Sequence, residues 1–205
     1  MPKETFFNIS KEKQQWILEI LLDKFYDRHI SQVKVSEIVE AMEMSRGAFY
    51  KYFQDLEDAY TFTVRNYSNR VHGDIIASIN RNRDHFFLGI EEYLAWCGEL
   101  SKNSPYWRSI KLLTRASDLG SSKRLPTYHD SSMVQQWLDL LKINQISMDT
   151  TEEAISFLYF MMALVMNSLT DYMVNQWTAE ELIEDFRYKV KWLEIGIKSK
   201  NANEQ

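Results

Sequence analysis

The residues with the clearest capacity for chemistry lie in the run SRGAFYKYF, residues 45–53. Tyr50 and Lys51 supply a hydroxyl and a cation, which are groups that bind phosphate oxygens and fix the register of a protein on a duplex. Gly47 lets the backbone approach a phosphate closely. The chain carries a net charge of −5, so non-specific attraction of nucleic acid over the whole surface is excluded. Any such binding must come from a local arrangement, and residues 44–54 contain two cations and no acid.

The residues that catalysis usually requires are scattered or missing. No HExxH, CxxC, Glu-x-x-His or glycine-rich phosphate motif is found. Cys97 lies among apolar neighbours, which favours an inert core thiol over a nucleophile and excludes an internal disulfide. The spacing of His72 and Asp74 would allow a metal contact, but solvation at the surface is the simpler interpretation. We expect no enzyme activity, no metal and no cofactor.

The elements that position residues 45–53 are predicted to be helices. With 6 Gly and 3 Pro in 205 residues and no alternating strand pattern, the sequence indicates an all-α protein. A first helix capped by Ser10 presents a core-facing stripe, and two short helices follow it. The third begins near Ser45 and turns Phe49 and Phe53 inward, so that Gly47, Tyr50, Lys51 and Gln54 face outward. Such a rigidly held short helix suits insertion into a major groove.

About nine helices are predicted in total. A long one runs from Asp55 to about Asn80, and others cover 84–102, Pro105 to near Gly120, and 133–144. Two long C-terminal helices begin at Thr150 or Thr151 and near Thr178. Residues 117–132 are predicted to form the longest loop. The apolar stretch 154–169 is interrupted by polar residues and short for a membrane span, so we interpret it as a buried helix.

The run SRGAFYKYF, preceded by SEIVEAMEMS, closely resembles the DNA-binding domain of the tetracycline-repressor (TetR) family. The resemblance covers about residues 10–60. It implies a three-helix, helix-turn-helix DNA-binding domain over residues 1–60 and a helical ligand-binding and dimerisation domain over residues 61–205.

Position by position, the resemblance implies DNA contacts from the start of the second helix through the third. Arg46 and Ala48 are the candidates for base contacts. The full set is Lys34, Ser36, Ser45, Arg46, Gly47, Ala48, Tyr50, Lys51 and Tyr52. Two positions depart from the family pattern: Glu43 replaces the usual Gly of the turn, and Leu56 replaces a common Lys. These departures bear on DNA affinity more than on fold.

The C-terminal part is interpreted from its apolar patterns. The helix from Glu152 to about Gln176 is apolar on more than one face, and with the last helix it would form an intermolecular four-helix bundle in a homodimer. The predicted interface residues are Tyr159, Met162, Met166, Leu169, Phe186, Val190 and Leu193. Aromatic residues on the middle helices are candidates to line a pocket for a small apolar or aromatic inducer, with a plain core as the alternative. These are Tyr93, Trp96, Trp107, Met133 and Trp137.

These observations predict a cytoplasmic DNA-binding transcriptional regulator, a repressor on family habit. It would bind a palindromic double-stranded operator as a homodimer, with no membrane partner. The alternative is a helical interaction protein of the same fold that has lost specific DNA binding.

Overall fold

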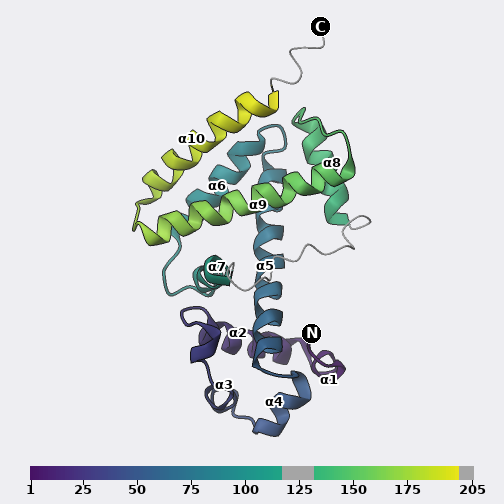
Figure 1. Ribbon diagram of the computed structural model, residues 1–205, viewed down its shortest axis with the longest axis vertical. Coiled ribbons are helices and arrows are strands. Elements are labelled where there is room, and N and C mark those ends of the chain that lie inside the picture. Colours follow the sequence, from purple (N-terminus) through teal and green to yellow (C-terminus); the bar gives the residue numbers. More distant parts are fainter. Residues whose placement is uncertain (117–131, 199–205) are drawn as a thin grey trace. The chain divides into compact units, whose positions relative to one another are not determined.

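The structure is a computed structural model that describes residues 1–116 and 132–198 (Figure 1). This part of the chain contains ten α-helices, one short 3₁₀ turn and no strand, which confirms the all-α prediction. About nine helices were predicted, and the additional one is α1 (Glu4–Phe7), which the sequence pattern did not indicate. Most of the predicted loop over 117–132 lies outside the described residues.

Packing divides the chain into two compact units, and α5 contributes to both. The first unit contains Met1–Val71 and α7, and the second contains His72–Leu100, α8, α9 and α10. The remaining helices are α2 (Lys11–Phe25), α3 (Val35–Ala41), α4 (Arg46–Tyr52), α5 (Leu56–Arg81), α6 (Phe86–Glu99), α7 (Pro105–Ala116), α8 (Ser132–Ile143), α9 (Thr151–Val174) and α10 (Ala179–Lys198). The boundary predicted after residue 60 separates a DNA-binding domain from a ligand-binding and dimerisation domain. It divides the chain by function and not by packing, so it stays a prediction.

Helix starts follow the predicted caps. The Ser10 hydroxyl accepts a hydrogen bond from the Lys13 N–H at 3.3 Å, and α2 begins at the next residue. Thr150 caps α9 in the same way, accepting from the Glu153 N–H at 3.1 Å. Because such caps satisfy N–H groups that have no partner inside the helix, they fix the starts of both helices.

The core of the first unit is built from aromatic and branched side chains of α1 to α5, with α7 added. Phe25, Phe49, Phe53 and Tyr60 are all buried in it. On α7, Leu112 and Ala116 join the same core.

Charges reinforce this packing of α7 on α2. Arg108 forms an ion pair with Asp23 at 2.9 Å, and Lys111 pairs with Asp27. Both cations also lie over the Tyr26 ring, 5.2 and 5.6 Å from its centroid. Helix α7 is therefore part of the unit that contains α4.

The second unit depends on a close approach of α6 to the last turns of α5. A Cβ at Gly89 would lie 2.5 Å from the Ile79 Cα, so no other residue fits there without moving the backbone. Helix α10 packs on α6 and on α9. Trp137 is fully buried between Phe86 and Phe157, at ring-centroid distances of 5.6 and 5.8 Å.

Helix α9 is the one described helix that length and composition would allow to cross a membrane. Ala154, Leu158, Met161, Val165 and Leu169 are buried along one side of it. Core helices meet the same criterion, and this buried face agrees with the interpretation of α9 as a core helix.

The turn between α3 and α4 places Glu43 in the left-handed region, with φ of 47°. Its N–H donates to the Glu40 carbonyl, and the Met44 N–H donates to the Val39 carbonyl at 2.9 Å. This pair of bonds is the Schellman motif, in which glycine is the favoured residue at the position of Glu43. The departure noted in the sequence therefore strains the turn.

We expect Glu43→Gly to increase the free energy of unfolding by about 1 kcal/mol, because the left-handed conformation costs a side-chain-bearing residue about 1–2 kcal/mol and glycine adds a smaller entropic cost. Denaturant unfolding at fixed protein concentration measures the change. Glu43→Gln is the matched control, since it removes the charge and keeps the strain. Equal stabilisation by both variants would attribute the effect to charge instead.

Candidate nucleic-acid interface

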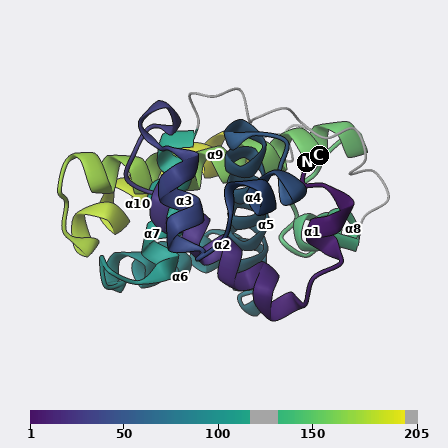
Figure 2. The same ribbon diagram turned by 90° about the horizontal axis from the view of Figure 1, so that it is seen from below.

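Helices α3 and α4 form a helix-turn-helix (Figure 2). Its second helix is held by a cap at its start and by two buried phenylalanines on its inner side. The Ser45 hydroxyl accepts a hydrogen bond from the Ala48 N–H at 3.2 Å and begins α4. Phe49 and Phe53 are 1% and 0% exposed, and their ring centroids lie 5.4 Å apart. These anchors leave the opposite side of α4 facing outward.

The residues predicted to contact DNA lie on that accessible side. Tyr50 is 38% exposed, although the edge of its ring meets Phe49. The exposed members are Lys34, Ser36, Ser45, Arg46, Gly47, Tyr50 and Lys51, and the half-buried ones are Ala48 and Tyr52. The predicted set therefore extends from the N-cap of α3 through the turn to the end of α4, and Tyr52 is the member that packs against the core.

Gly47 is not required by the packing of the protomer. A Cβ at this position would meet nothing closer than the Ser45 hydroxyl oxygen, at 3.8 Å. Since glycine also weakens a helix relative to alanine, its presence here calls for a reason outside the protomer. Close approach of another molecule's backbone would be such a reason.

The acid nearest the predicted contacts on α3 is paired. Glu37 accepts a 2.7 Å hydrogen bond from the guanidinium of Arg28, which also donates to the Lys24 carbonyl. The bond from Arg28 holds the pKa of Glu37 below its usual value. Its charge is thus partly compensated beside Ser36.

Helix α1 contributes to the candidate interface, and sequence reasoning missed it. Phe6 is fully buried, and its ring packs against Tyr52, Phe53 and Phe62 at centroid distances of 5.9, 5.4 and 5.1 Å. A four-residue helix has no detectable period, so only the apolar pair Phe6–Phe7 before the Ser10 cap could have indicated it.

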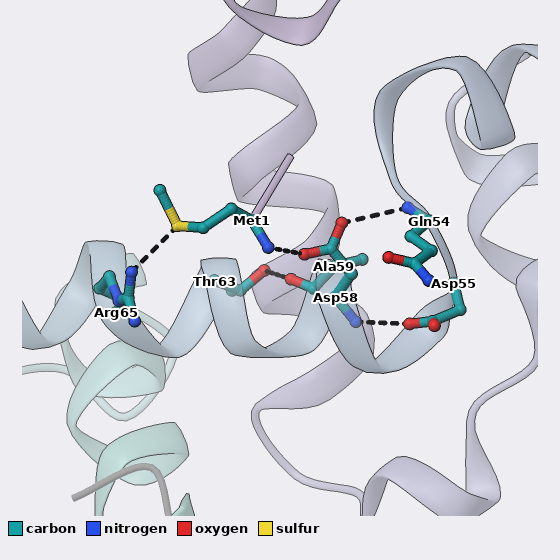
Figure 3. Close-up of polar contacts among 7 residues, drawn as sticks. All are labelled: Met1, Gln54, Asp55, Asp58, Ala59, Thr63 and Arg65. Atoms are coloured by element: carbon teal, nitrogen blue, oxygen red, sulfur yellow. Dashed lines mark hydrogen bonds and ion pairs between the residues drawn. The ribbon is translucent and has the colours of Figure 1, made fainter. Parts of the chain in front are cut away.

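Two carboxylates accept hydrogen bonds at the start of α5, just beyond α4 (Figure 3). Asp58 accepts from the Gln54 N–H at 3.1 Å, and Asp55 accepts from the Asp58 N–H at 2.7 Å. The Met1 amino group forms an ion pair with Asp58. The Asp55 side chain thus satisfies one of the first N–H groups of α5, and the bond from Gln54 to Asp58 links the end of α4 to the start of α5.

The residues predicted to line a ligand pocket are divided between the two units. Tyr93, Trp96 and Trp137 belong to the second unit, whereas Trp107 belongs to the first. Trp137 donates its indole N–H to the Ala154 carbonyl at 2.8 Å, which favours the alternative interpretation of a core residue. The side chain of Met133, on α8, lies outside the described part.

A hollow of about 200 Å³ lies elsewhere in the second unit. It is lined by Asp84, His85, Phe86, Phe87, Leu88, Asn144, Ile146 and Glu194. Of the predicted pocket residues whose side chains are described, none borders it. On α6, burial raises the pKa of the Cys97 thiol to about 12, which opposes formation of the thiolate near neutral pH.

The predicted dimer residues divide by burial. Met162, Leu169 and Phe186 are buried inside the protomer. Half-buried are Tyr159, Met166, Val190 and Leu193. Among the described side chains of α9 and α10, the large apolar ones that are exposed are Phe160, Val174, Tyr188 and Trp192, at 48, 72, 52 and 68%. Helical period alone did not show which apolar faces of α9 and α10 are covered within the protomer, and the dimer interface on these helices stays a prediction.

An all-helical chain with a helix-turn-helix near its N-terminus and a larger helical unit beyond it has the architecture of a TetR-type regulator. The sequence model of the tetracyclin repressor-like C-terminal domain matches residues 85–197. The chain belongs to the tetracycline-repressor family, whose members are transcriptional regulators and not enzymes.

Solved structures are similar at low identity. A TetR family transcriptional regulator from Chloroflexus aurantiacus is 21% identical, with a TM-score of 0.47, over 96% of this chain and 91% of that one. A γ-butyrolactone receptor, described as ArpA-like, is 16% identical, with a TM-score of 0.48, over 87% of this chain and 97% of that one. No curated protein matches the chain by sequence.

Proposed function

We propose that this protein is a cytoplasmic DNA-binding repressor of transcription that binds a palindromic operator through α4. The observation that carries the proposal is the division of one short helix: Phe49 and Phe53 are buried, whereas Tyr50 and Lys51 are exposed. A helix anchored on one side with hydroxyl and cationic groups on the other suits the major groove.

The proposed complex contains two copies of the chain. Two α4 helices, one from each subunit, would enter successive major grooves about 34 Å apart on one face of the duplex. The exposed aromatic residues of α9 and α10 are the proposed dimer contacts, since exposed apolar groups of this size favour association. A four-helix bundle formed by these helices and their symmetry mates would cover them.

Regulation by a small apolar or aromatic inducer is part of the proposal. Helix α5 runs without a break from Leu56 to Arg81 and has residues in both units. The dimer would exist in two states, one with the α4 spacing that fits successive major grooves and one without it. An inducer that binds the second state more tightly would release the operator, because only a difference in affinity between the two states shifts their equilibrium. The tilt of α5 is the proposed link.

Selection of bound duplexes from a random DNA pool tests the function directly. The regulator should recover a palindrome and bind it with an affinity that falls steeply as salt rises. Absence of specific binding even at low salt would favour the alternative, an interaction protein without DNA binding. Two observations favour that alternative. Glu43 strains the turn before α4, and Leu56 packs against the core at a position where the family pattern commonly has a phosphate-binding Lys.

Replacing Tyr50 and Lys51 together with Ala should weaken binding of the selected duplex by at least tenfold and reduce the salt slope by about 1, since one phosphate-binding cation is lost. Fluorescence anisotropy over a salt series measures both quantities. Arg83→Ala is the matched control: it removes an exposed cation from the second unit. Wild-type affinity of the double variant would disprove the assignment of α4.

Gly47→Ala should change the stability of the fold and the affinity for DNA in opposite directions. The variant should be as stable as wild type or more so, by up to about 1 kcal/mol, because alanine is the better helix former and the space is open. Its affinity for the selected duplex should nevertheless fall. Gly73→Ala, on α5 with nothing within 4 Å of its Cβ, is the control that should gain stability and keep affinity. If both variants bind alike, Gly47 does not mark a close approach.

Trp192→Glu should raise the dimer dissociation constant at least tenfold, because a charge would replace an apolar side chain at the proposed interface. Sedimentation equilibrium measures the constant. Trp16→Glu is the control, since Trp16 is also an exposed tryptophan, at 40%, but lies on α2. An unchanged dimer in the Trp192 variant would show that α10 does not form the interface.

A further inference from the structure

The last turn of α4 ends on three consecutive carbonyl groups that have no partner within the helix. The final helical bond of α4 runs from the Phe53 N–H to the Phe49 carbonyl at 2.9 Å. The next N–H along the chain, that of Gln54, donates to Asp58 instead. The carbonyls of Tyr50, Lys51 and Tyr52 must therefore be satisfied from outside the helix or by water.

The N-terminal segment, residues 3–6, supplies a donor to every one of the three. The Lys3 ammonium donates to the Tyr50 carbonyl at 2.7 Å. The Thr5 hydroxyl donates to the Lys51 carbonyl. The Lys3 backbone N–H donates to the Tyr52 carbonyl at 2.8 Å. A cation at the negative end of a helix is also electrostatically favourable.

Phe6 fixes the segment to the core while these donors reach α4. Its ring is fully buried against Tyr52 and Phe53, which are the residues at the end of α4. Lys3 and Thr5 themselves are exposed, so they contribute little to the core. Their polar groups instead bind main-chain carbonyls of α4. These carbonyls belong to Tyr50, Lys51 and Tyr52, whose side chains are proposed to contact DNA phosphates.

We propose that residues 3–6 are a C-terminal cap for the recognition helix, and that Lys3 and Thr5 are positioning residues for DNA binding. The cap holds the last turn of α4, and with it Tyr50, Lys51 and Tyr52, in the orientation that a duplex requires. Binding groups must be held within about 0.5 Å of their productive geometry, which a frayed last turn would not provide. The DNA part of this inference rests on the proposed function.

The alternative for Lys3 is a direct contact with phosphate, and salt dependence separates the two roles. A positioning residue lies outside the phosphate contacts, so Lys3→Met should weaken binding of the selected duplex about three- to tenfold without changing the salt slope. A phosphate contact would instead lower the slope by about 1. Lys142→Met, an exposed lysine on α8, is the matched control for loss of charge.

Amide hydrogen exchange of the full chain without DNA tests the cap independently. Thr5→Val and Lys3→Met should each speed exchange of the Tyr52 and Phe53 amides at least threefold, while the α9 amides stay as in wild type. Thr5→Ser keeps the hydroxyl and should restore both exchange and affinity. Because both side chains are exposed, the variants are expected to fold with a melting temperature close to that of wild type.

Unchanged exchange at Tyr52 and Phe53, or equal acceleration in all helices, would overturn the cap. A reduced salt slope in Lys3→Met would overturn the positioning role of Lys3. A wild-type protein that selects no duplex would refute the proposed function and the DNA part of this inference, whereas the exchange result would still decide the cap.

Discussion

Burial of Phe49 and Phe53 is the interaction on which the candidate interface depends. A seven-residue helix is too short to persist alone, so tertiary packing must hold α4 in place. The two rings enter a cluster that includes Phe6, Phe25 and Tyr60, and each is almost completely removed from water. Loss of one such ring would cost about 3–5 kcal/mol, a large share of the stability of a domain. The same burial determines which side of α4 is left to meet another molecule.

Most of the helical order was predictable because helix signals are local. The Ser10, Ser45 and Thr150 caps and the stripe along α2 each depend on residues three or four apart, and the structure confirms them. The left-handed turn at Glu43 was also visible as a departure from glycine. These features need no knowledge of what packs where.

What could not be predicted depends on long-range packing. Helix α1 is defined by bonds to residues more than forty positions away, and α7 joins the first unit through Asp23 and Asp27 on α2. The residues predicted for an interface on α9 and α10 were chosen without this information. An apolar stripe on a helix shows that it is covered, but not whether α6 or a second chain covers it, and Leu169 and Phe186 prove to be covered within the protomer.

Two local rules are broken near α4, and both violations concern backbone. Glu43 occupies a conformation that suits glycine, and Gly47 occupies a helical position where alanine would serve the fold better. Departures of this kind are expected where a requirement other than stability acts on the sequence. At Gly47 the requirement is consistent with contact from outside, because nothing inside the protomer fills the space. At Glu43 the side chain brings an acid to the same turn, which opposes phosphate binding. The pairing of Arg28 with Glu37 compensates one charge nearby. Arg46, in the first turn of α4, and Lys51, in its last turn, are the exposed cations that oppose the charge of Glu43, so their placement matters more here than the net charge of the chain.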